Sequence, residues 1–407
     1  MGDTVFARYS RGLLAGSALL LLATAAFNRI VDPFQYFGAP RIPGFNEVKS
    51  RLRFFEREVK PAVVKREQPE AVILGSSIAA IGFEPLHPAL TRDGRARSYN
   101  FAIAGAPWKE VFCALEYVLA QTHARRIVFG MIAQPMPDED CGTSLAAMNE
   151  NRLPEILLSP QAVQHSLKTL RSQGPHEPQT HTPAGRYLFF RDDPRVEHRA
   201  RIFFEENLRS KTTCAEDRLR HSLDAPSRPF APDAAAPFDL SGLKRIVAQV
   251  SGRDVQLRIV LYPRHVIGAE ADFLCGEEEQ RWSAMYHIAR YLEAHPPAPP
   301  ASVELWDFQG YGSPFDEPLG GGVLTYWQDP IHFNPVLGDR MLDAMFGRDS
   351  PAPDPIEGFG YKVETGTLAA RRAWLAAQRA AFLRAHPETW DTLMRLVPDH
   401  VQRSRPS

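Results

Sequence analysis

A short segment near residue 75 carries side chains that could do nucleophilic chemistry. The stretch AVILGSS (71–77) runs from four apolar residues through a glycine to two serines. A serine hydroxyl becomes a good nucleophile only when a histidine takes its proton, and that histidine needs a carboxylate to fix its tautomer. By itself the segment is typical of a strand followed by a turn or a helix N-cap. Its interpretation depends on whether a histidine and a carboxylate can reach it.

A histidine and an aspartate at a suitable spacing occur near residue 330. In TYWQDPIHFNP (325–335), Asp329 and His332 are three residues apart, and Pro330 and Pro335 restrict the loop. This spacing can place the carboxylate beside the imidazole ring. The pair alone is equally typical of a helix cap followed by a surface histidine, and Asn334 could cap the next helix.

The surrounding elements predict an α/β fold. Short β-rich apolar runs alternate with longer amphipathic stretches, which is typical of parallel strands joined by crossover helices. We therefore expect a three-layer α/β/α, flavodoxin-like parallel sheet. The predicted strands are 71–74, 98–103, 126–132, 255–262 and 302–308, and the predicted helices are 107–122, 239–251, 277–294 and 335–346.

Ligands of such sheets bind at the carboxyl ends of the strands, so the residues that follow each strand are informative. Ser77 follows the first strand, and its N–H could stabilise an oxyanion together with that of Gly105, which follows the second. Gln134 follows the third strand. The remaining strand-end residues are Arg264 and His265 after the fourth strand and Asp329 and His332 past the fifth.

Other polar residues at this edge could support the site or bind substrate. His265 is a second imidazole that Asp307 could orient, although each is equally typical of an ordinary turn or strand end. Arg264 could recognise an anionic polymer or could be a solvated loop charge. Asn100, in the stretch NFAIAGA, is a further candidate.

These blocks resemble the SGNH/GDSL-like hydrolase superfamily over roughly residues 70 to 346. The resemblance implies that ILGSS carries the nucleophile Ser77, that Gly105 donates to the oxyanion, and that DPIH supplies the base His332 with Asp329 as its orienter. More narrowly, the chain resembles membrane-anchored, exported bacterial members, which are distantly similar to alginate O-acetyltransferase-like proteins and the teichoic-acid alanylation protein. The resemblance therefore implies a serine-dependent O-acyl esterase or acyltransferase that acts on a cell-surface or secreted glycan.

The chain departs from the superfamily pattern at the third block. An asparagine normally completes the oxyanion hole there, whereas this chain has FGMIAQP, in which Gln134 could substitute. Losing one such donor costs about 10²–10³ in rate. The alternative is therefore a catalytically inert scaffold that binds a polysaccharide or a membrane export machine.

The N-terminus predicts membrane targeting. Arg8 and Arg11 precede the apolar run 12–27, which is shorter than the roughly 20 residues of a full span, and 23–25 reads Ala-Thr-Ala, as at a signal-peptidase site. We expect a retained anchor that Ile30 and Val31 extend, with cleavage and secretion as the alternative. In both cases the remainder would be exported, and a retained anchor would be a single-pass inner-membrane helix with a periplasmic domain.

The predicted domains are an anchor (1–31), a membrane-proximal linker (32–69), an α/β domain (70–349) with an inserted cap at about 140–235, and a helical extension (350–407). A membrane-bound acyl-transfer partner would be compatible with this arrangement. The cap region contains His176 and His181, which we interpret as exposed turn residues, so no metal is assigned.

Composition excludes some function classes. Lys and Arg total 47 against 48 Asp and Glu, and this balance argues against a nucleic-acid partner. No P-loop or GxGxxG motif occurs, and no cofactor is predicted. Disulfides are permitted in an exported protein. No pairing can be read from the sequence. Cys113 is expected to be a buried apolar residue outside any bridge, so that a disulfide, if one forms, is expected among Cys141, Cys214 and Cys275.

Overall fold

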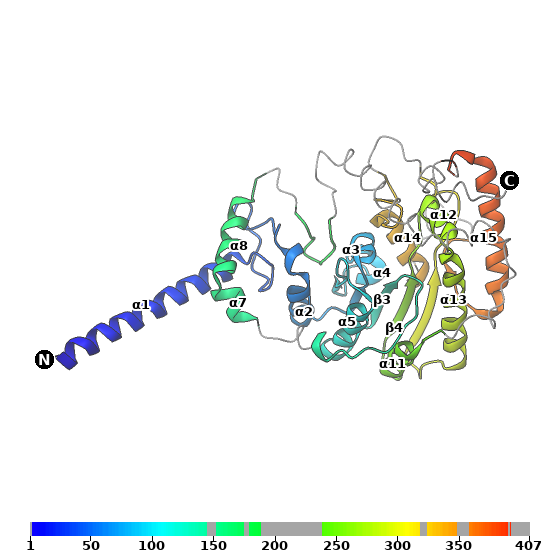
Figure 1. Ribbon diagram of the computed structural model, residues 1–407. Helices are drawn as coiled ribbons and strands as arrows, with labels where there is room; N and C mark the ends of the chain where they lie inside the picture. Colours follow the sequence, from blue (N-terminus) through cyan, green and yellow to red (C-terminus); the bar gives the residue numbers. More distant parts are fainter. Residues whose placement is uncertain are drawn as a thin grey trace. The chain divides into compact units, whose positions relative to one another are not determined.

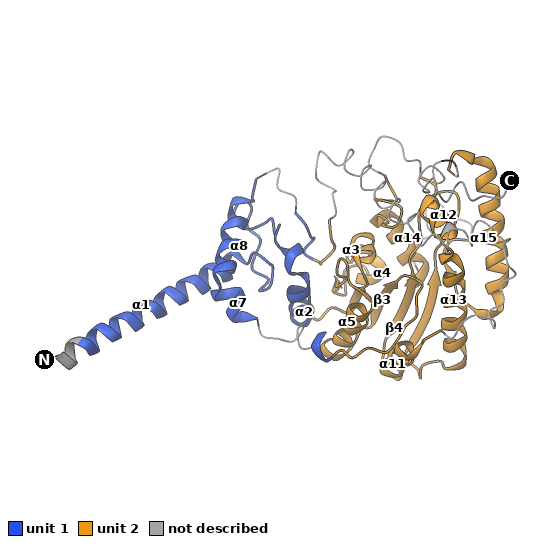
Figure 2. Ribbon diagram, viewed as in Figure 1, with its two compact units in different colours: residues 1–67, 142–183 blue, residues 68–141, 184–407 orange. Residues whose placement is uncertain are grey.

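The protein is described from a computed structural model in which residues 2–144, 152–174, 179–188, 238–317, 324–347, 358–389 and 391 are placed. The chain divides into two compact units (Figure 2). The first comprises residues 1–67 and 142–183, and the second comprises residues 68–141 and 184–407.

The second unit is built on a six-stranded sheet with the order β2-β1-β3-β4-β5-β6. Figure 1 labels its two central strands, β3 and β4. The first five strands are parallel and β6 pairs antiparallel with β5. The order 2-1-3-4-5 is one of the two common orders of doubly wound sheets, in which ligands bind at the carboxyl edge. The strands are β1 (Ala71–Leu74), β2 (Ser98–Asn100), β3 (Arg126–Met131), β4 (Gln256–Leu261), β5 (Ser302–Asp307) and β6 (Tyr361–Lys362).

Helices cover both faces of this sheet. Successive strand residues point to opposite faces, and all four residues of β1 are fully buried. Val128 of β3 joins the core formed with helices α3, α12 and α14. Its neighbour Phe129 instead meets Trp108 of α5 edge-on, with ring centroids 5.9 Å apart. The helices of this unit are α3 (Ser77–Gly82), α4 (Pro88–Thr91), α5 (Trp108–Gln121), α11 (Ser241–Val250), α12 (Val266–Leu274), α13 (Glu277–Ala294), α14 (Pro335–Phe346) and α15 (Thr365–Ala385).

The five predicted strands and four predicted helices of the sheet domain are present, with ends shifted by a few residues. Helices α3, α4 and α12 were missed because they are short and carry no extended apolar period. The chain beyond residue 350 contributes more than helix, because β6 adds a strand to the sheet before α15 begins.

The first unit contains the N-terminal helix α1 (Gly2–Val31) together with η1 (Leu52–Phe55), α2 (Glu56–Glu67), α7 (Leu153–Leu158) and α8 (Pro160–Arg171). Residues 6–31 of α1 are long and apolar enough to cross a membrane or to serve as a signal sequence, with a mean hydropathy of 1.6. The helix extends past the apolar run 12–27 because Ile30 and Val31 continue it.

The last turns of α1 are built into the first unit. Asn28 is fully buried, donates to the carbonyl of Leu157 in α7 at 2.8 Å, and accepts from the Ser166 hydroxyl of α8 at 2.7 Å. The fully buried Lys49 ammonium donates to the carbonyls of Val31 and Asp32, both at 2.8 Å. These bonds satisfy carbonyls at the C-terminal end of α1 that have no partner within the helix.

The interpretation of His181 as an exposed turn residue is wrong. Its side chain is fully buried, and Nε2 lies 2.6 Å from a carboxylate oxygen of Glu56, which also pairs with the buried Lys60. Burial lowers the pKa of His181 to about 4. His176, and much of the predicted cap at 140–235, lie outside the described residues.

The expectation for Cys113 is also wrong, because it forms a disulfide with Cys141. Cys113 lies on α5, and the chain that leaves β3 returns past this helix to bring the two Cα atoms within 5.4 Å. Burial therefore does not show whether a cysteine is free or disulfide-bonded, since both cysteines of this disulfide are almost fully buried. Cys275 is also disulfide-bonded.

Candidate active site

The turn between β1 and α3 presents Ser77 at the carboxyl edge of the sheet. Gly75 has a φ of +147°, and a Cβ there would lie 2.2 Å from the hydroxyl of Tyr262 and 2.9 Å from the carbonyl of Gly130. Only glycine fits this close approach. Ser76 is the N-cap residue of α3, and its backbone N–H donates to the Tyr262 hydroxyl at 3.3 Å. Ser77 is consequently fixed as the first residue of the helix.

The loop that carries Asp329 and His332 is closed on itself by backbone hydrogen bonds. The Gln328 N–H donates to the His332 carbonyl at 2.8 Å, and the Asn334 N–H donates to the Tyr326 carbonyl at 2.7 Å. Asn334 occupies the N-cap position of α14, but its side chain makes no cap hydrogen bond there and instead donates to carbonyls of residues 324, 325 and 327. Its amide therefore holds the loop.

Ser77, His332 and Asp329 lie in one hydrogen-bonded line. Ser77 Oγ is 2.8 Å from His332 Nε2, and His332 Nδ1 is 2.6 Å from Asp329 Oδ2. Asp329 is fully buried, and its other carboxylate oxygen accepts from the backbone N–H groups of Ile331 at 2.8 Å and His332 at 3.0 Å. The carboxylate thus fixes the histidine tautomer in which Nε2 can accept the serine proton.

The predicted oxyanion donors are two backbone N–H groups, those of Ser77 and Gly105. The first residue of a helix has an N–H without an intrahelical partner, and in α3 this residue is Ser77. Gly105 has a φ of +72° in a turn closed by the Ala106 N–H and the Ile103 carbonyl at 3.1 Å. The Ile103 N–H in turn donates to the Gly75 carbonyl at 3.0 Å, and this bond keeps the turn beside the nucleophile.

Gln134 lies farther along the same edge. It is half-buried, follows β3, and lines a cavity with Arg264. Within the described part of the chain, it makes no hydrogen bond to Ser77 or His332. Its expected oxyanion role therefore stays a prediction.

The Asn100 side chain is hydrogen-bonded to the backbone of α3 and of the residue that follows it. It is fully buried at the end of β2, and its amide nitrogen donates to the carbonyls of Ala79 at 3.0 Å and Phe83 at 3.1 Å. Its amide oxygen accepts from the Ala102 N–H at 3.1 Å. Asn100 therefore positions the helix that carries Ser77, and contact with substrate is excluded by its burial.

His265 is not a second base. It is the N-cap residue of α12, only 2% exposed, with Nδ1 accepting from the Ile267 N–H at 3.3 Å and Nε2 lying 2.9 Å from the Glu317 carbonyl. Burial lowers the pKa of His265 to about 4. Its backbone N–H donates to the Pro330 carbonyl at 3.1 Å, so the residue holds the Asp329 loop in place instead.

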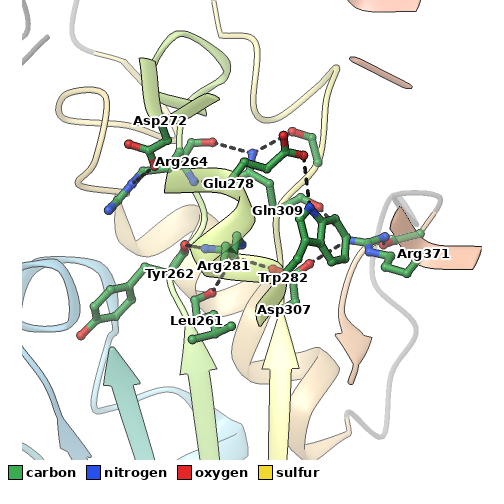
Figure 3. A network of polar contacts seen from close by, with 12 residues as sticks. Leu261, Tyr262, Arg264, Asp272, Glu278, Arg281, Trp282, Asp307, Gln309 and Arg371 are labelled. Atoms are coloured by element: carbon green, nitrogen blue, oxygen red, sulfur yellow. Dashed lines mark hydrogen bonds and ion pairs between the residues drawn. The ribbon is translucent and has the colours of Figure 1, made fainter. Parts of the chain in front are cut away.

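Asp307 does not orient His265, because both of its carboxylate oxygens pair with arginines (Figure 3). The partners are Arg281 of α13 and Arg371 of α15. Arg264 is also largely buried, and its Nε donates to Asp272 at 3.1 Å. The interpretation of Arg264 as a solvated loop charge is therefore wrong.

Sequence reasoning missed Tyr262, whose hydroxyl holds the nucleophile turn. The residue is 1% exposed, and a Cβ at Gly75 would lie 2.2 Å from its hydroxyl, whereas a Cβ at Gly130 would lie 2.4 Å from its ring. Burial raises the pKa of this phenol, which keeps it neutral. A glycine in the middle of a buried strand is the signal that could have pointed to this contact.

The sheet and these side chains define the class of molecule: a doubly wound α/β protein with a Ser–His–Asp arrangement at its carboxyl edge. Comparison with models of known protein families finds none that matches this chain, and no curated protein matches it either.

Proposed function

We propose that this protein is an exported serine-dependent O-acyl esterase or acyltransferase that modifies a cell-surface or secreted glycan. The observation that carries the proposal is the hydrogen-bonded line from Ser77 Oγ through His332 to Asp329. This geometry is the one required for a serine nucleophile with its general base. The resemblance of ILGSS, NFAIAGA and DPIH to the SGNH/GDSL-like blocks is a second line of support for the proposal.

The reaction proceeds in two steps through an acyl-serine. His332 Nε2 takes the proton of Ser77 Oγ as the oxygen attacks the acyl carbonyl carbon, and the N–H groups of Ser77 and Gly105 stabilise the oxyanion. Collapse of the tetrahedral intermediate releases the alcohol, which leaves with the proton held by His332. Water or a sugar hydroxyl then gives a proton to His332 and attacks the acyl carbonyl carbon. Collapse of this second tetrahedral intermediate breaks the bond to Ser77 Oγ, which takes the proton back from His332, and releases the free acid or the acylated sugar.

The location and the glycan class rest on separate support. Helix α1 is apolar over residues 6–31, and Arg8 and Arg11 near its start favour a cytoplasmic N-terminus. The bonds that build the end of α1 into the first unit favour retention of the helix as an inner-membrane anchor. The disulfide between Cys113 and Cys141 fits a periplasmic location. The glycan class comes from the resemblance alone.

A serine-directed fluorophosphonate probe tests this function. We expect the full-length protein to be labelled, labelling to be lost in Ser77→Ala and His332→Ala, and the matched control Ser76→Ala to retain it. Mass spectrometry of the labelled peptide identifies the modified serine. Folded wild-type protein that takes up no label would overturn the enzyme proposal in favour of an inert glycan-binding scaffold.

A further inference from the structure

A cavity of about 220 Å³ lies at the carboxyl ends of β3, β4 and β5, on the same edge of the sheet as Ser77. Figure 3 shows several of the residues that line it, among them Arg264, Arg281 and Trp282. Neighbouring strands are about 4.8 Å apart, so the ends of these strands are about 5–14 Å along the edge from the end of β1. The cavity is lined by residues that follow the strands and by residues of α12 and α13. They include Gln134, Arg264, Phe273, Arg281, Trp282 and Tyr311.

Arg264, which lines this cavity, has a hydrogen-bond donor without an acceptor among the described residues. The residue is 8% exposed, and its backbone N–H and carbonyl are both held by the Gln309 amide, at 2.8 and 3.2 Å. Its Nε donates to Asp272, whereas its Nη1 is buried and has no hydrogen-bond partner in the described part of the chain. Such a group in a folded protein requires an explanation, because an unsatisfied buried donor is costly.

Arg281 repeats this pattern from a different element. Its Nη1 donates to the Tyr262 carbonyl at 3.0 Å and its Nη2 to Asp307, but its buried Nε has no partner among the described residues. The two residues that carry these orphan donors, one after β4 and one on α13, therefore both line the same cavity. A ligand that brings hydrogen-bond acceptors would satisfy both.

The charges of the lining select against an anionic ligand. The two arginines are accompanied by three carboxylates, those of Asp272, Glu277 and Glu278. Burial raises the pKa of Glu278, which accepts from the Trp282 indole N–H at 3.1 Å. A hydroxyl group both donates and accepts, so a polyhydroxylated neutral ligand suits neighbouring guanidinium and carboxylate groups better than an anion does.

We propose that this cavity binds one neutral sugar ring through its hydroxyl groups. The proposal rests on the glycan-directed function above and identifies its substrate class: the bound ring belongs to the same saccharide as the group that reacts at Ser77. The guanidinium donors of Arg264 and Arg281 bind hydroxyl oxygens, the carboxylates of Asp272 and Glu278 accept hydroxyl protons, and the half-buried faces of Phe273 and Tyr311 contact the ring carbons.

Ligand-observed saturation-transfer NMR tests the proposal on the full-length Ser77→Ala protein, so that binding is measured without catalysis. The probes are the methyl glycosides of glucose, mannose and galactose, with glucuronate and galacturonate as anionic counterparts. We expect at least one neutral glycoside to bind and both uronates to bind at least fivefold more weakly.

Two variants in the Ser77→Ala background place the binding at this cavity. Arg264→Met removes the orphan donor, and Gln280→Trp blocks the cavity from an exposed position on α13 that carries little folding risk. Both should reduce binding at least fivefold, whereas Arg290→Trp, an exposed position later on α13, should not.

Binding of uronates alone, no binding by any glycoside, or full binding by Gln280→Trp would overturn the sugar site. Fluorophosphonate labelling of the wild-type serine is an independent readout. Labelling without sugar binding would reject this inference alone, and sugar binding without labelling would reject the acyl-transfer proposal alone.

Discussion

At the scale of single residues, the candidate site depends on a contact between side chains 255 positions apart. Ser77 and His332 come from opposite ends of the sheet domain, and their 2.8 Å separation relies on neighbours that do no chemistry. Tyr262 holds the Ser76 N–H, and the His265 N–H holds the Pro330 carbonyl. The turn that carries Ser77 and the loop that carries His332 are thus each hydrogen-bonded, through a backbone group, to the segment that follows β4.

Asp329→Asn separates the orienting role of this carboxylate from its structural role. The amide oxygen of asparagine can still accept from the N–H groups of Ile331 and His332, so the loop should keep its shape. An amide N–H facing His332 Nδ1 would favour the tautomer with the proton on Nε2, and this tautomer cannot accept the serine proton. We expect fluorophosphonate labelling to slow by about 10³–10⁴-fold.

Stopped-time labelling with quantified adducts measures that rate, and circular dichroism with a urea titration checks the fold. A variant that labels at the wild-type rate would contradict the role of Asp329.

At the scale of elements, the distance between helices α3 and α14 sets the geometry of the site. A Cβ at Gly338 of α14 would lie 1.9 Å from the Gly82 carbonyl at the end of α3, and a Cβ at Gly82 would lie 2.2 Å from the Phe333 ring. The two helices are therefore in backbone contact. Ser77 begins one of them, and His332 lies just before the other.

Gly338→Ala should push these two helices apart. Because the clash is with backbone, we expect a loss of about 1–3 kcal/mol in the free energy of unfolding. We also expect labelling to slow by about tenfold or more, since displacements of about 1 Å in a catalytic geometry can cost about 10² in rate.

The matched control is Gly366→Ala near the start of α15, where a Cβ would meet nothing within 4 Å. Urea unfolding and labelling rates are compared for both variants. Equal labelling rates in Gly338→Ala and wild type would show that the helix contact does not position Ser77.

At the scale of the whole molecule, each unit contains a buried histidine that is neutral when folded. His181 in the first unit and His265 in the second both have a pKa of about 4, chiefly because burial penalises the charged ring. In the unfolded chain the pKa of histidine is about 6.5. Between pH 6.5 and 4 the unfolded state therefore binds more protons than the folded state.

The free energy of unfolding should consequently fall as the pH is lowered from 6.5 to 4, by up to about 3 kcal/mol for each histidine. His265→Asn should flatten this dependence, because asparagine can cap α12 without titrating. The measurement is a series of urea titrations across this pH range.

The control for that series is His295→Asn, an exposed position at the end of α13 that should leave the slope unchanged. If the free energy of unfolding of His265→Asn depended on pH as steeply as that of the wild type, His265 would not be a source of the pH dependence.

Local sequence pattern determined the elements of the sheet domain, because burial of a strand or an amphipathic helix leaves its periodicity in the chain itself. The runs 71–74 and 126–132 became β1 and β3, and the helix expected at 277–294 became α13. Residue types at strand ends also indicated Ser77 and His332 as the pair to examine, and their side chains are in contact.

Only the tertiary structure decided which polar groups are buried and what they meet. Cys113 pairs with Cys141, His265 caps a helix, and His181 meets Glu56, although none of these partners is apparent from local pattern. The same holds for the cavity beside Arg264, whose walls come from three strand ends and three helices. The physical reason is that burial and hydrogen bonding at these positions depend on contacts between segments far apart in sequence, and a pattern within one segment carries no record of them.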